Sequence, residues 1–310
     1  MTSERTILLI LHNKRDGISE IACIVKKVLR DNKINLETIC IESIKKCSTS
    51  NTHSTLNKLD INFEVTKDLD HLTKSYELIL AFGGDGTLLK AAEYAHMIAV
   101  PLLGVNLGHI GFLAEAEVEA INKVLEGIVN INYKIEERMT LDIFIKVGNK
   151  ITSYGWVFNE ASLENLSCLG VIGVVLEIDN YPVSSFGCDG VLISTPTGST
   201  GYAFSAGGPI LWPDTEAILI VPNNAHTLFS RPIVTSPLTK ISIRIESSLV
   251  NKAKASVVCD GHRKIVVSSG TKLEVSRCKT SMKLVRLDKT SFADRLVSKF
   301  RLPVRGWRGS

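Results

Sequence analysis

LILAFGGDGTLLKAAE, residues 78–93, is the stretch that decides the fold and first indicates the chemistry of this chain. Its first five residues form an apolar run typical of a buried strand, and residues 88–93 have the composition of a helix start. Glycines between a strand and a helix let backbone N–H groups approach an anion closely, and the helix N-terminus adds partial positive charge. The stretch therefore predicts a phosphate site in an α/β domain.

Asp85, in the middle of this glycine turn (residues 83–87), limits the kinds of reaction that the phosphate site could support. A carboxylate repels phosphate, so it is a poor choice for phosphate binding alone. It is useful where it holds a metal ion or removes a proton beside the phosphate, and this indicates phosphoryl transfer. The alternative is a tight turn in which Asp85 only caps the helix.

The composition limits the class of protein. A chain of 310 residues with 45% hydrophobic and 22% charged residues is typical of a folded protein large enough for two domains. Apolar runs such as residues 170–176 fall far short of the roughly 20 residues that span a bilayer, and no secretory signal is evident. We therefore expect a cytoplasmic protein with no membrane partner.

The net charge and the cysteine pattern argue against a nucleic-acid-binding protein and against a protein stabilised by zinc or disulfides. The net charge of +4 is mild and the charges are interspersed, so the sequence predicts no nucleic-acid partner. The seven cysteines are scattered and form no CxxC pair, so neither a zinc site nor a disulfide framework is predicted.

The first part of the chain alternates strand and helix signals. Strands are expected at residues 6–11, 34–41, 78–82 and 100–105, a helix begins at Ile18, and residues 43–62 have the composition of a loop. Such alternation favours a parallel sheet with helices on its faces, where ligands bind at the carboxyl ends of strands. The glycine turn lies at one such end.

The texture changes near Tyr133 to short strands separated by glycine and Asx turns, which favours a mostly antiparallel β domain. The expected strands are residues 141–147, 152–158, 171–178, 191–195, 240–245, 255–259 and 272–275, and a helix is expected at residues 290–300. We therefore predict three parts: an α/β domain at residues 1–132, a β-rich domain at 133–288, and a terminal helix and tail at 289–310.

A second segment, DGVLISTPTGSTGYAFSAGGP at residues 189–209, is dense in glycine and small hydroxyl residues. This hydroxyl-rich segment offers many backbone N–H and O–H donors in a small volume, which suits a diphosphate or a ribose. The alternative is a surface loop.

Asn159-Glu160 follows another expected strand. Asn can pair with a base edge and Glu can accept hydrogen bonds from both hydroxyls of a ribose, although an edge-of-strand turn explains the dipeptide equally well. Neither a Walker motif nor a G-x-G-x-x-G turn after a strand is present.

Together these motifs resemble the NAD kinase family, whose pattern contains a GGDGT turn, an Asn-Glu or Asn-Asp pair, and a D-G-x-x-x-S-T-P-T-G-S-T-[AG]-Y stretch. All three stand here in that order, and the resemblance includes NLGHIGFL at residues 106–113 and PNNAHTLFSRP at 222–232. It implies an NAD kinase-like two-domain fold, an α/β N-terminal domain plus a β-rich, mostly antiparallel C-terminal domain, with the active site between them.

The resemblance implies a reaction and its residues. Asp85 would remove the proton from the 2′-hydroxyl of the adenosine ribose of NAD as that oxygen attacks the γ-phosphate of ATP, with Mg²⁺ arriving mainly through the ATP phosphates and no protein metal site. NAD and ATP are the expected substrates. The implied binding residues are Gly83, Gly84, Asp85, Gly86, Thr87 and Lys90 on the phosphate side, and Asn159, Glu160, Asp189, Thr200, Gly201, Tyr202, Ala203, Phe204 and Ser205 around the dinucleotide.

Some features stay open at this point. Asp260-Gly261-His262 stands where many members have Asp-Gly-Gln, so no ligand role is carried over to His262; a turn after a strand explains it. The family implies a homodimer or homotetramer, and a final helix that packs on the first domain.

Two alternative functions stay open. A lipid kinase of the diacylglycerol or sphingosine type shares the GGDGT turn, and a protein that senses NAD without turnover is an alternative that is not an enzyme. The sequence does not distinguish ATP from polyphosphate as donor or NAD from NADH as acceptor.

Overall fold

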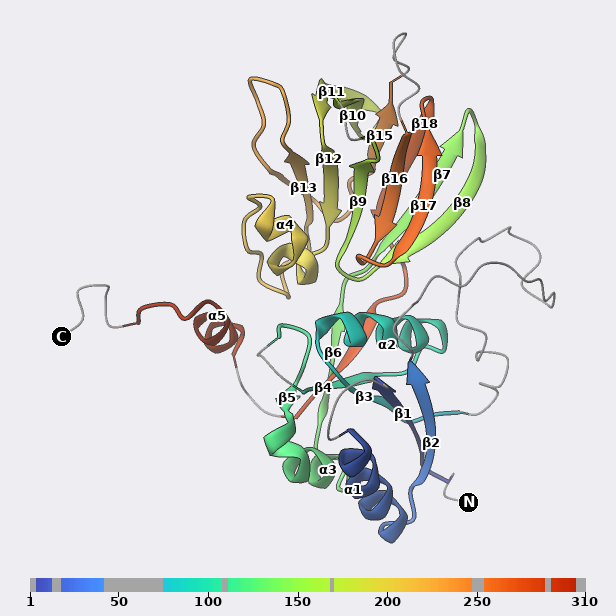
Figure 1. The fold of residues 1–310 in the computed structure, drawn as a ribbon, viewed down its shortest axis with the longest axis vertical. Coiled ribbons are helices and arrows are strands. Elements are labelled where there is room, and N and C mark those ends of the chain that lie inside the picture. The colour runs from blue at the N-terminus through green and yellow to red at the C-terminus, as the bar shows by residue number, and fades with distance from the viewer. Residues whose placement is uncertain are drawn as a thin grey trace. The chain divides into compact units, whose positions relative to one another are not determined.

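The structure, a computed structural model, describes residues 4–12, 18–41, 75–107, 111–167, 170–246, 254–287 and 291–304. The predicted loop at residues 43–62 and residues 108–110 of the NLGHIGFL stretch lie outside them. The chain divides into two compact units (Figure 1). The first unit contains the described residues as far as Arg138 and those from Met282 onward, and the second unit contains Met139–Ser281.

The first unit is a mixed sheet with helices on both faces. Its strands are β1 (Thr6–His12), β2 (Asn35–Ile41), β3 (Leu78–Phe82), β4 (Leu102–Asn106), β5 (Ala116–Glu117), β6 (Lys134–Arg138) and β19 (Met282–Arg286). Its helices are α1 (Ile18–Asp31), α2 (Asp85–Met97), the short η2 (Val118–Ala120), α3 (Ile121–Val129) and α5 (Phe292–Phe300). The strand order is β2-β1-β3-β4-β19-β6, with β5 beside β4; β6 runs antiparallel to β19 and the other pairs are parallel.

The core of the first unit explains why its strands are continuous apolar runs. Alternate residues of β1 and β3, such as Leu9 and Leu80, pack with Val25 of α1 and Leu125 of α3. Helix α2 covers the opposite face of the sheet (Figure 1). Because both faces are covered, β3 and β4 are buried along their whole length.

The second unit is a sandwich of two antiparallel sheets. One has the order β11-β10-β15-β18-β7-β8 and the other β14-β13-β12-β9-β16-β17. The strands are β7 (Leu141–Val147), β8 (Lys150–Val157), β9 (Glu160–Asn165), β10 (Ile172–Ile178), β11 (Tyr181–Cys188), β12 (Gly190–Ser194), β13 (Ile218–Asn223), β14 (Ile233–Thr235), β15 (Ile241–Ile245), β16 (Lys254–Cys259), β17 (Arg263–Ser268) and β18 (Thr271–Arg277). Inward-facing residues of both sheets form one hydrophobic cluster. Two short helices, η3 (Thr197–Thr200) and α4 (Tyr202–Ser205), follow β12.

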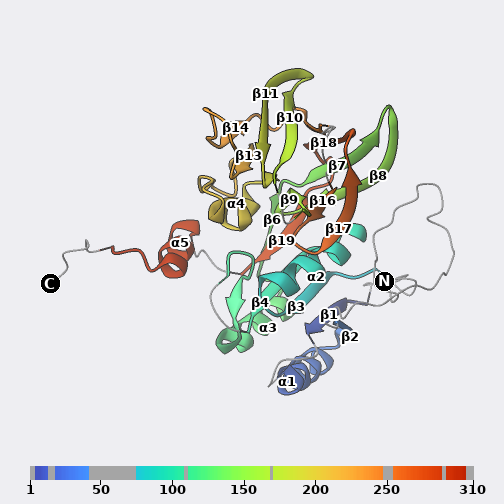
Figure 2. The ribbon, with the colours of Figure 1, turned by 45° about the horizontal axis from the view of Figure 1, so that its top comes forward.

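The predicted fold class, an α/β domain followed by a mostly antiparallel β-rich domain, is confirmed. The compact units change near residues 138 and 281, whereas the sequence places the changes near 132 and 288. The difference arises because β6 and β19 pair with each other, and β19 also pairs with β4, in the first sheet (Figure 2). The strand signals missed β5, β6, β9, β11, β13, β14, β17 and β19, and helix α3 was not predicted either.

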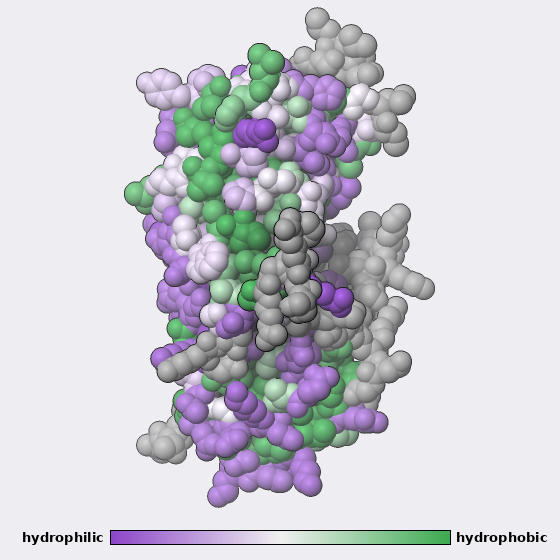
Figure 3. Space-filling model, turned by 90° about the vertical axis from the view of Figure 1, so that its left-hand side faces the viewer, coloured by the Kyte–Doolittle hydropathy of each residue, from purple (hydrophilic) through white to green (hydrophobic). Residues whose placement is uncertain are grey.

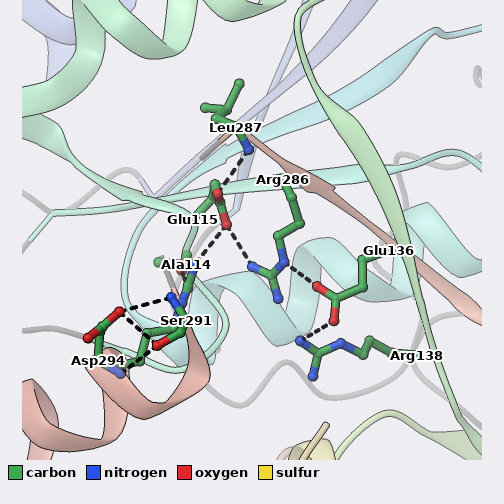
Figure 4. Close-up of polar contacts among 9 residues, drawn as sticks. Ala114, Glu115, Glu136, Arg138, Arg286, Leu287, Ser291 and Asp294 are labelled. Carbon is green, nitrogen blue, oxygen red and sulfur yellow. Dashed lines mark hydrogen bonds and ion pairs between the residues drawn. The ribbon is translucent and has the colours of Figure 1, made fainter. Parts of the chain in front are cut away.

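A buried carboxylate joins α5 to the first sheet (Figure 4). Glu115, whose side chain is 1% exposed, accepts from Arg286 of β19 at 2.7 Å and from Arg295 of α5 at 2.8 Å, as well as from the Leu287 N–H. Phe112 adds ring contacts of 5.8 Å to Phe292 and to Phe300 of the same helix. No helix in the described ranges combines the length and apolarity needed to cross a bilayer.

Replacing Glu115 by Gln tests this junction. The substitution removes the carboxylate that pairs with the largely buried guanidinium of Arg295 and leaves Arg286 with Glu136 as its remaining carboxylate partner, so we expect the free energy of unfolding to fall by about 3 kcal/mol. Urea denaturation measures the change. The control is Glu216→Gln, which breaks an ion pair between Arg277 and a 54% exposed Glu216 and should cost less than about 1 kcal/mol. Equal losses in the two variants would contradict the role given to Glu115.

Candidate functional site

The glycine turn connects β3 to α2 without any intervening loop. The Gly83 N–H donates to the Val105 carbonyl of β4 at 3.0 Å, which continues the sheet pairing into the turn. Thr87 and Leu88 donate their N–H groups to the Gly84 carbonyl at 2.8 and 3.1 Å, so α2 begins at Asp85. No side chain caps the helix at Gly84. The alternative in which Asp85 serves as the N-cap is therefore wrong, because Asp85 is already the first helical residue.

The backbone at this helix start can receive an anion. The N–H groups of Gly84, Asp85 and Gly86 precede the first intrahelical hydrogen bonds, and the helix dipole adds positive charge there. A Cβ atom added to Gly86 would meet nothing within 4 Å, so the space beside its backbone is open. At Gly83 an added Cβ would lie 2.4 Å from Cβ of the buried Thr87, so this glycine is required by packing.

The carboxylate of Asp85 lies against the backbone of Gly111. A Cβ atom added to Gly111 would come within 2.2 Å of Asp85 Oδ1. That oxygen is buried and has no hydrogen-bond partner among the described residues. A carboxylate oxygen without a partner, beside the N–H groups at a helix start, is the arrangement that a substrate hydroxyl next to a phosphate would complete.

Lys90 and a nearby pocket extend this part of the first unit. Lys90 lies one helical turn after Gly86, is half-buried, and forms no ion pair within the described ranges. A pocket of about 340 Å³ shares Gly111 with the Asp85 site and has Asn106, the last residue of β4, in its wall. Its remaining walls come from residues 114–124, Leu287 and α5. Ligand space thus exists at the carboxyl end of a parallel strand, as expected for an α/β sheet.

In the second unit, Asn159 and Glu160 lead into β9. The sequence predicts them at the end of the preceding strand, and the structure shows that Glu160 is the first residue of the next one. The Asn159 carbonyl accepts from the Thr195 N–H at 2.9 Å and from Ser194 Oγ at 3.1 Å. Asn159 Oδ1 and Glu160 Oε2 are buried and lack a hydrogen-bond partner in the described chain. Two side chains of this dipeptide therefore present unused acceptors.

Burial changes the protonation of Glu160. Desolvation, followed by repulsion from the Asp260 carboxylate, raises the pKa of Glu160 to about 8. A ligand that donates two hydroxyl hydrogen bonds to this side chain would favour its charged form and lower that pKa.

The hydroxyl-rich segment packs directly on this dipeptide. Thr195 Oγ1 donates to the Phe158 carbonyl at 2.6 Å and accepts from the Gly198 N–H at 3.1 Å. A Cβ atom at Gly198 would lie 2.2 Å from the Asn159 carbonyl oxygen, so only glycine fits there. At Gly201 an added Cβ would lie 3.4 Å from Glu160 Oε2 and 3.8 Å from Asn159 Nδ2. Gly201 therefore borders the volume that both side chains face.

The remaining predicted residues divide into exposed and buried ones. Tyr202 is 41% exposed, and its hydroxyl accepts from Asn223 Nδ2 at 3.3 Å. Partial burial, and then the carboxylates of Glu164 and Asp189, raise the pKa of Tyr202. Asp189 is exposed and accepts from Asn224 Nδ2 at 2.8 Å. Among the others, Thr200 is half-buried, Phe204 and Ser205 are exposed, and Ala203 is fully buried against Leu192, Leu219 and Val221.

Two family models and a full-length relative match this chain. A model of the ATP-NAD kinase N-terminal domain matches residues 7–133, and one of the ATP-NAD kinase C-terminal domain matches residues 158–287. The chain is 54% identical over 309 residues to the NAD kinase of Mycobacterium bovis, covering 100% of both chains. This chain belongs to the NAD kinase family.

Solved structures extend the comparison to the fold of the NAD kinase family. The chain is similar to yeast NADH kinase complexed with NADH, with a TM-score of 0.80 and 18% identity, over 99% of this chain and 90% of that one. It is also similar to an NAD kinase from Archaeoglobus fulgidus in complex with ATP, with a TM-score of 0.67 and 21% identity, over 96% and 98% of the two chains. These likenesses support the fold, and the family resemblance seen in the motifs is confirmed by the two family models and the full-length identity.

Two residues at these sites were not singled out from the sequence. Gly111 stands within the NLGHIGFL stretch, and its contact with Asp85 depends on the path of a segment that is distant in sequence. Asp260 accepts from the N–H groups of Phe158 and Asn159, although the sequence indicated only a turn there. Burial raises the pKa of Asp260, while Arg263 and the two N–H groups oppose that rise. The signal was the Asp-Gly pair after a strand, which resembles any tight turn.

The NAD kinase family implies Mg²⁺, and the donor atoms near the glycine turn decide whether the described residues fit that ion. No group of three or more His, Cys, Asp and Glu side chains in the described ranges could hold a metal ion. Near the glycine turn, Asp85 Oδ1 is a buried carboxylate oxygen without a partner among the described residues. Such a donor set fits Mg²⁺ that takes its other ligands from phosphates and water.

The shifted pKa of Glu160 predicts a pH effect on stability. Because the folded state holds the proton more tightly than the unfolded chain, the stabilising contribution is fully present below about pH 4.5 and is lost as the pH rises through about 8. Glu160→Gln does not titrate at this position, so the variant should gain stability relative to the parent chain across that interval. Urea denaturation of both proteins at successive pH values measures this difference. A difference that stays constant with pH would contradict the buried, proton-retaining Glu160.

Proposed function

We propose that this member of the NAD kinase family transfers the γ-phosphate of ATP to the 2′-hydroxyl of the adenosine ribose of NAD, which yields NADP and ADP. The observation that carries the proposal is the Asp85 carboxylate oxygen at the start of α2, which is buried without a partner among the described residues and lies beside the first N–H groups of the helix. Full-length identity of 54% to a protein named NAD kinase supports the same activity.

In the proposed reaction Asp85 is the general base. Its free Oδ1 accepts the proton of the ribose 2′-hydroxyl while the ribose oxygen bonds to the γ-phosphorus, and the bond from that phosphorus to the bridging oxygen of ADP breaks. Base assistance is typically worth about 10²–10⁴ in rate. The N–H groups of Gly84 and Gly86 would bind phosphate oxygens, and Lys90 would offset their charge. Mg²⁺, when bound with ATP, supplies further neutralising charge.

Recognition of NAD is proposed for the second unit. Glu160 would accept hydrogen bonds from ribose hydroxyls, and Asn159 would meet a base edge or a hydroxyl. Asp189 and residues 200–205 would line the dinucleotide, with the exposed ring of Tyr202 available for stacking. Thr87 and Ala203, whose side chains are buried, would contribute through their backbone and packing.

The homodimer or homotetramer remains a proposal. Figure 3 shows hydrophobic surface, in green, on the face that carries α4 and β13. Exposed hydrophobic side chains in this part of the chain include Trp212, Leu228, Phe229 and Val234. Exposed apolar patches often mark contacts between proteins, so this surface suits self-association. A cytoplasmic location, and the lack of nucleic-acid and membrane partners, also remain predictions.

Membership of the NAD kinase family leaves the lipid kinase without support, and the remaining rival is an NAD sensor without turnover. Incubation with NAD, ATP and Mg²⁺, followed by assay of 2′-phosphorylated dinucleotide, separates the two. The proposal expects NADP in proportion to enzyme, and binding of NAD without product would support the sensor. Parallel reactions with polyphosphate in place of ATP, and with NADH in place of NAD, determine the donor and the acceptor.

Asp85→Asn tests the general base directly. The amide keeps the volume but does not accept the proton, so kcat should fall by at least about a hundredfold. The melting temperature should stay close to that of the parent chain, because Asp85 Oδ1 holds no partner that the variant would lose. Asp31→Asn, at the exposed end of α1, is the control and should retain full activity. Activity of the Asp85 variant within about tenfold of the parent would show that Asp85 is not the base.

A further inference from the structure

The turn between β16 and β17 holds a carboxylate that the proposed function does not use. Asp260 and Gly261 both have positive φ, 49° and 73°, which lets the chain reverse within three residues. The Asp260 side chain is only 2% exposed. His262 turns its Nδ1 to the Asp260 carbonyl oxygen at 2.7 Å, inside the same turn. Burial of a charged carboxylate costs free energy, so a carboxylate enclosed in this way is expected to have hydrogen-bond or ionic partners.

Asp260 has such partners. Its Oδ1 accepts from the Asn159 N–H at 2.7 Å, and both oxygens accept from the Phe158 N–H at 3.0 and 3.1 Å. In return, the Asp260 N–H donates to the Glu160 carbonyl at 2.9 Å. The turn therefore holds the backbone of residues 158–160 from one side.

The opposite side of the same backbone is held by the hydroxyl-rich segment. The Asn159 carbonyl accepts from Thr195 and Ser194, and Gly198 lies so close to it that no side chain would fit. The Asn159 peptide groups are thus fully occupied by two different strand ends. The buried side-chain atoms Asn159 Oδ1 and Glu160 Oε2 remain without partners in the described chain.

Arg263 completes the arrangement. Its guanidinium forms an ion pair with Asp260 Oδ2 and lies 4.9 Å above the ring centroid of Trp156, on the strand that leads to residue 158. The planar group is thereby held between a carboxylate and an aromatic face, which lowers its freedom to move. Arg263 thus fixes the carboxylate, and the carboxylate fixes the peptide.

We infer that Asp260, held by Arg263, is a positioning residue for the dinucleotide: it orients the Asn159–Glu160 backbone so that both side chains face the volume beside Gly201. Both of its oxygens are used by the protein, so it acts through the dipeptide and not on the ligand itself. The inference rests on the proposed function, since it assigns the bound molecule as NAD.

Asp260→Asn is the first test. The amide keeps the shape of the side chain, but its NH₂ group would face a backbone N–H. Because the amide is neutral, the ion pair with Arg263 is also lost. We expect the Kd of NAD, measured by titration calorimetry without ATP, to rise on the order of tenfold, and the KM of NAD to rise in parallel. The Kd of ATP and the kcat at saturating NAD should change less than about twofold, because the reacting groups at the glycine turn are untouched.

A matched control separates positioning from general loss of a buried ion pair. Glu274, on β18 of the other sheet, is 10% exposed and pairs with Lys146 at 2.6 Å. Glu274→Gln should therefore lower the melting temperature without changing the Kd of NAD. If Glu274→Gln weakens NAD binding as much as Asp260→Asn does, or if Asp260→Asn weakens NAD and ATP equally, the positioning role is refuted.

The Arg263 variants keep the test decisive if Asp260→Asn does not fold. Arg263→Met removes the ion pair and should weaken NAD binding several-fold, whereas Arg263→Lys keeps a cation beside Asp260 and should recover part of the affinity. NAD binding by Arg263→Met equal to that of the parent chain would overturn the inference. Failure of the parent chain itself to bind NAD or to form NADP would instead refute the proposed function, so the two failures are distinguishable.

Discussion

A buried hydrogen-bonding group without a partner costs free energy, and both candidate site motifs contain such groups among the described residues. Asp85 Oδ1 at the start of α2, and Asn159 Oδ1 and Glu160 Oε2 at the start of β9, are all in this condition. Each buried unsatisfied polar atom costs about 1–3 kcal/mol, so the surrounding structure must hold these atoms against their tendency to find partners. The proposed substrates would satisfy them, and their unfavourable state before binding is what makes them selective.

The two units hold these atoms by different backbone contacts. In the first unit, the Gly83 N–H continues the pairing with β4. Thr87 packs closely on Gly83, and this contact fixes the direction in which α2 leaves the sheet. In the second unit, the Asn159 peptide is bonded on both sides, by Asp260 and by Thr195. The bonded Asn159 peptide therefore keeps its side chain oriented, whereas packing of Thr87 on Gly83 fixes the start of α2 and leaves the first N–H groups of that helix for a ligand.

The cores explain how the chain tolerates this cost. Strands β3 and β4 are buried along their whole length, and the inner faces of both sheets of the sandwich form one cluster of aliphatic residues. Burial of apolar surface contributes about 25 cal/mol per Å², so a few strained polar positions are a small fraction of the total. Glu115 adds a buried junction that ties β19 and α5 to the segment containing Gly111. That segment is the one that lies against Asp85.

How much was predictable from the sequence differs between residues. The strand at residues 78–82 and the helix after it were predicted because an apolar run, a glycine turn and helix-forming residues are all local signals. The strand β9, with the sequence EASLEN, was not predicted, because its apolar content is low and its burial comes from neighbouring strands. Strand β6, KIEER, reads as a charged surface segment, yet it pairs with β19, which lies more than a hundred residues later.

The sequence by itself determined the family, the order of the domains and the residues of the glycine turn and the hydroxyl-rich segment, because these depend on local composition and spacing. Only the tertiary structure decided that Gly111 packs on Asp85 and that Asp260 holds Asn159 and Glu160. Asp260 and Asn159 are separated by about a hundred residues, and their hydrogen bond exists because β16 pairs with β9 in one sheet. Such a contact follows from strand order and register, which long-range packing sets and local sequence does not.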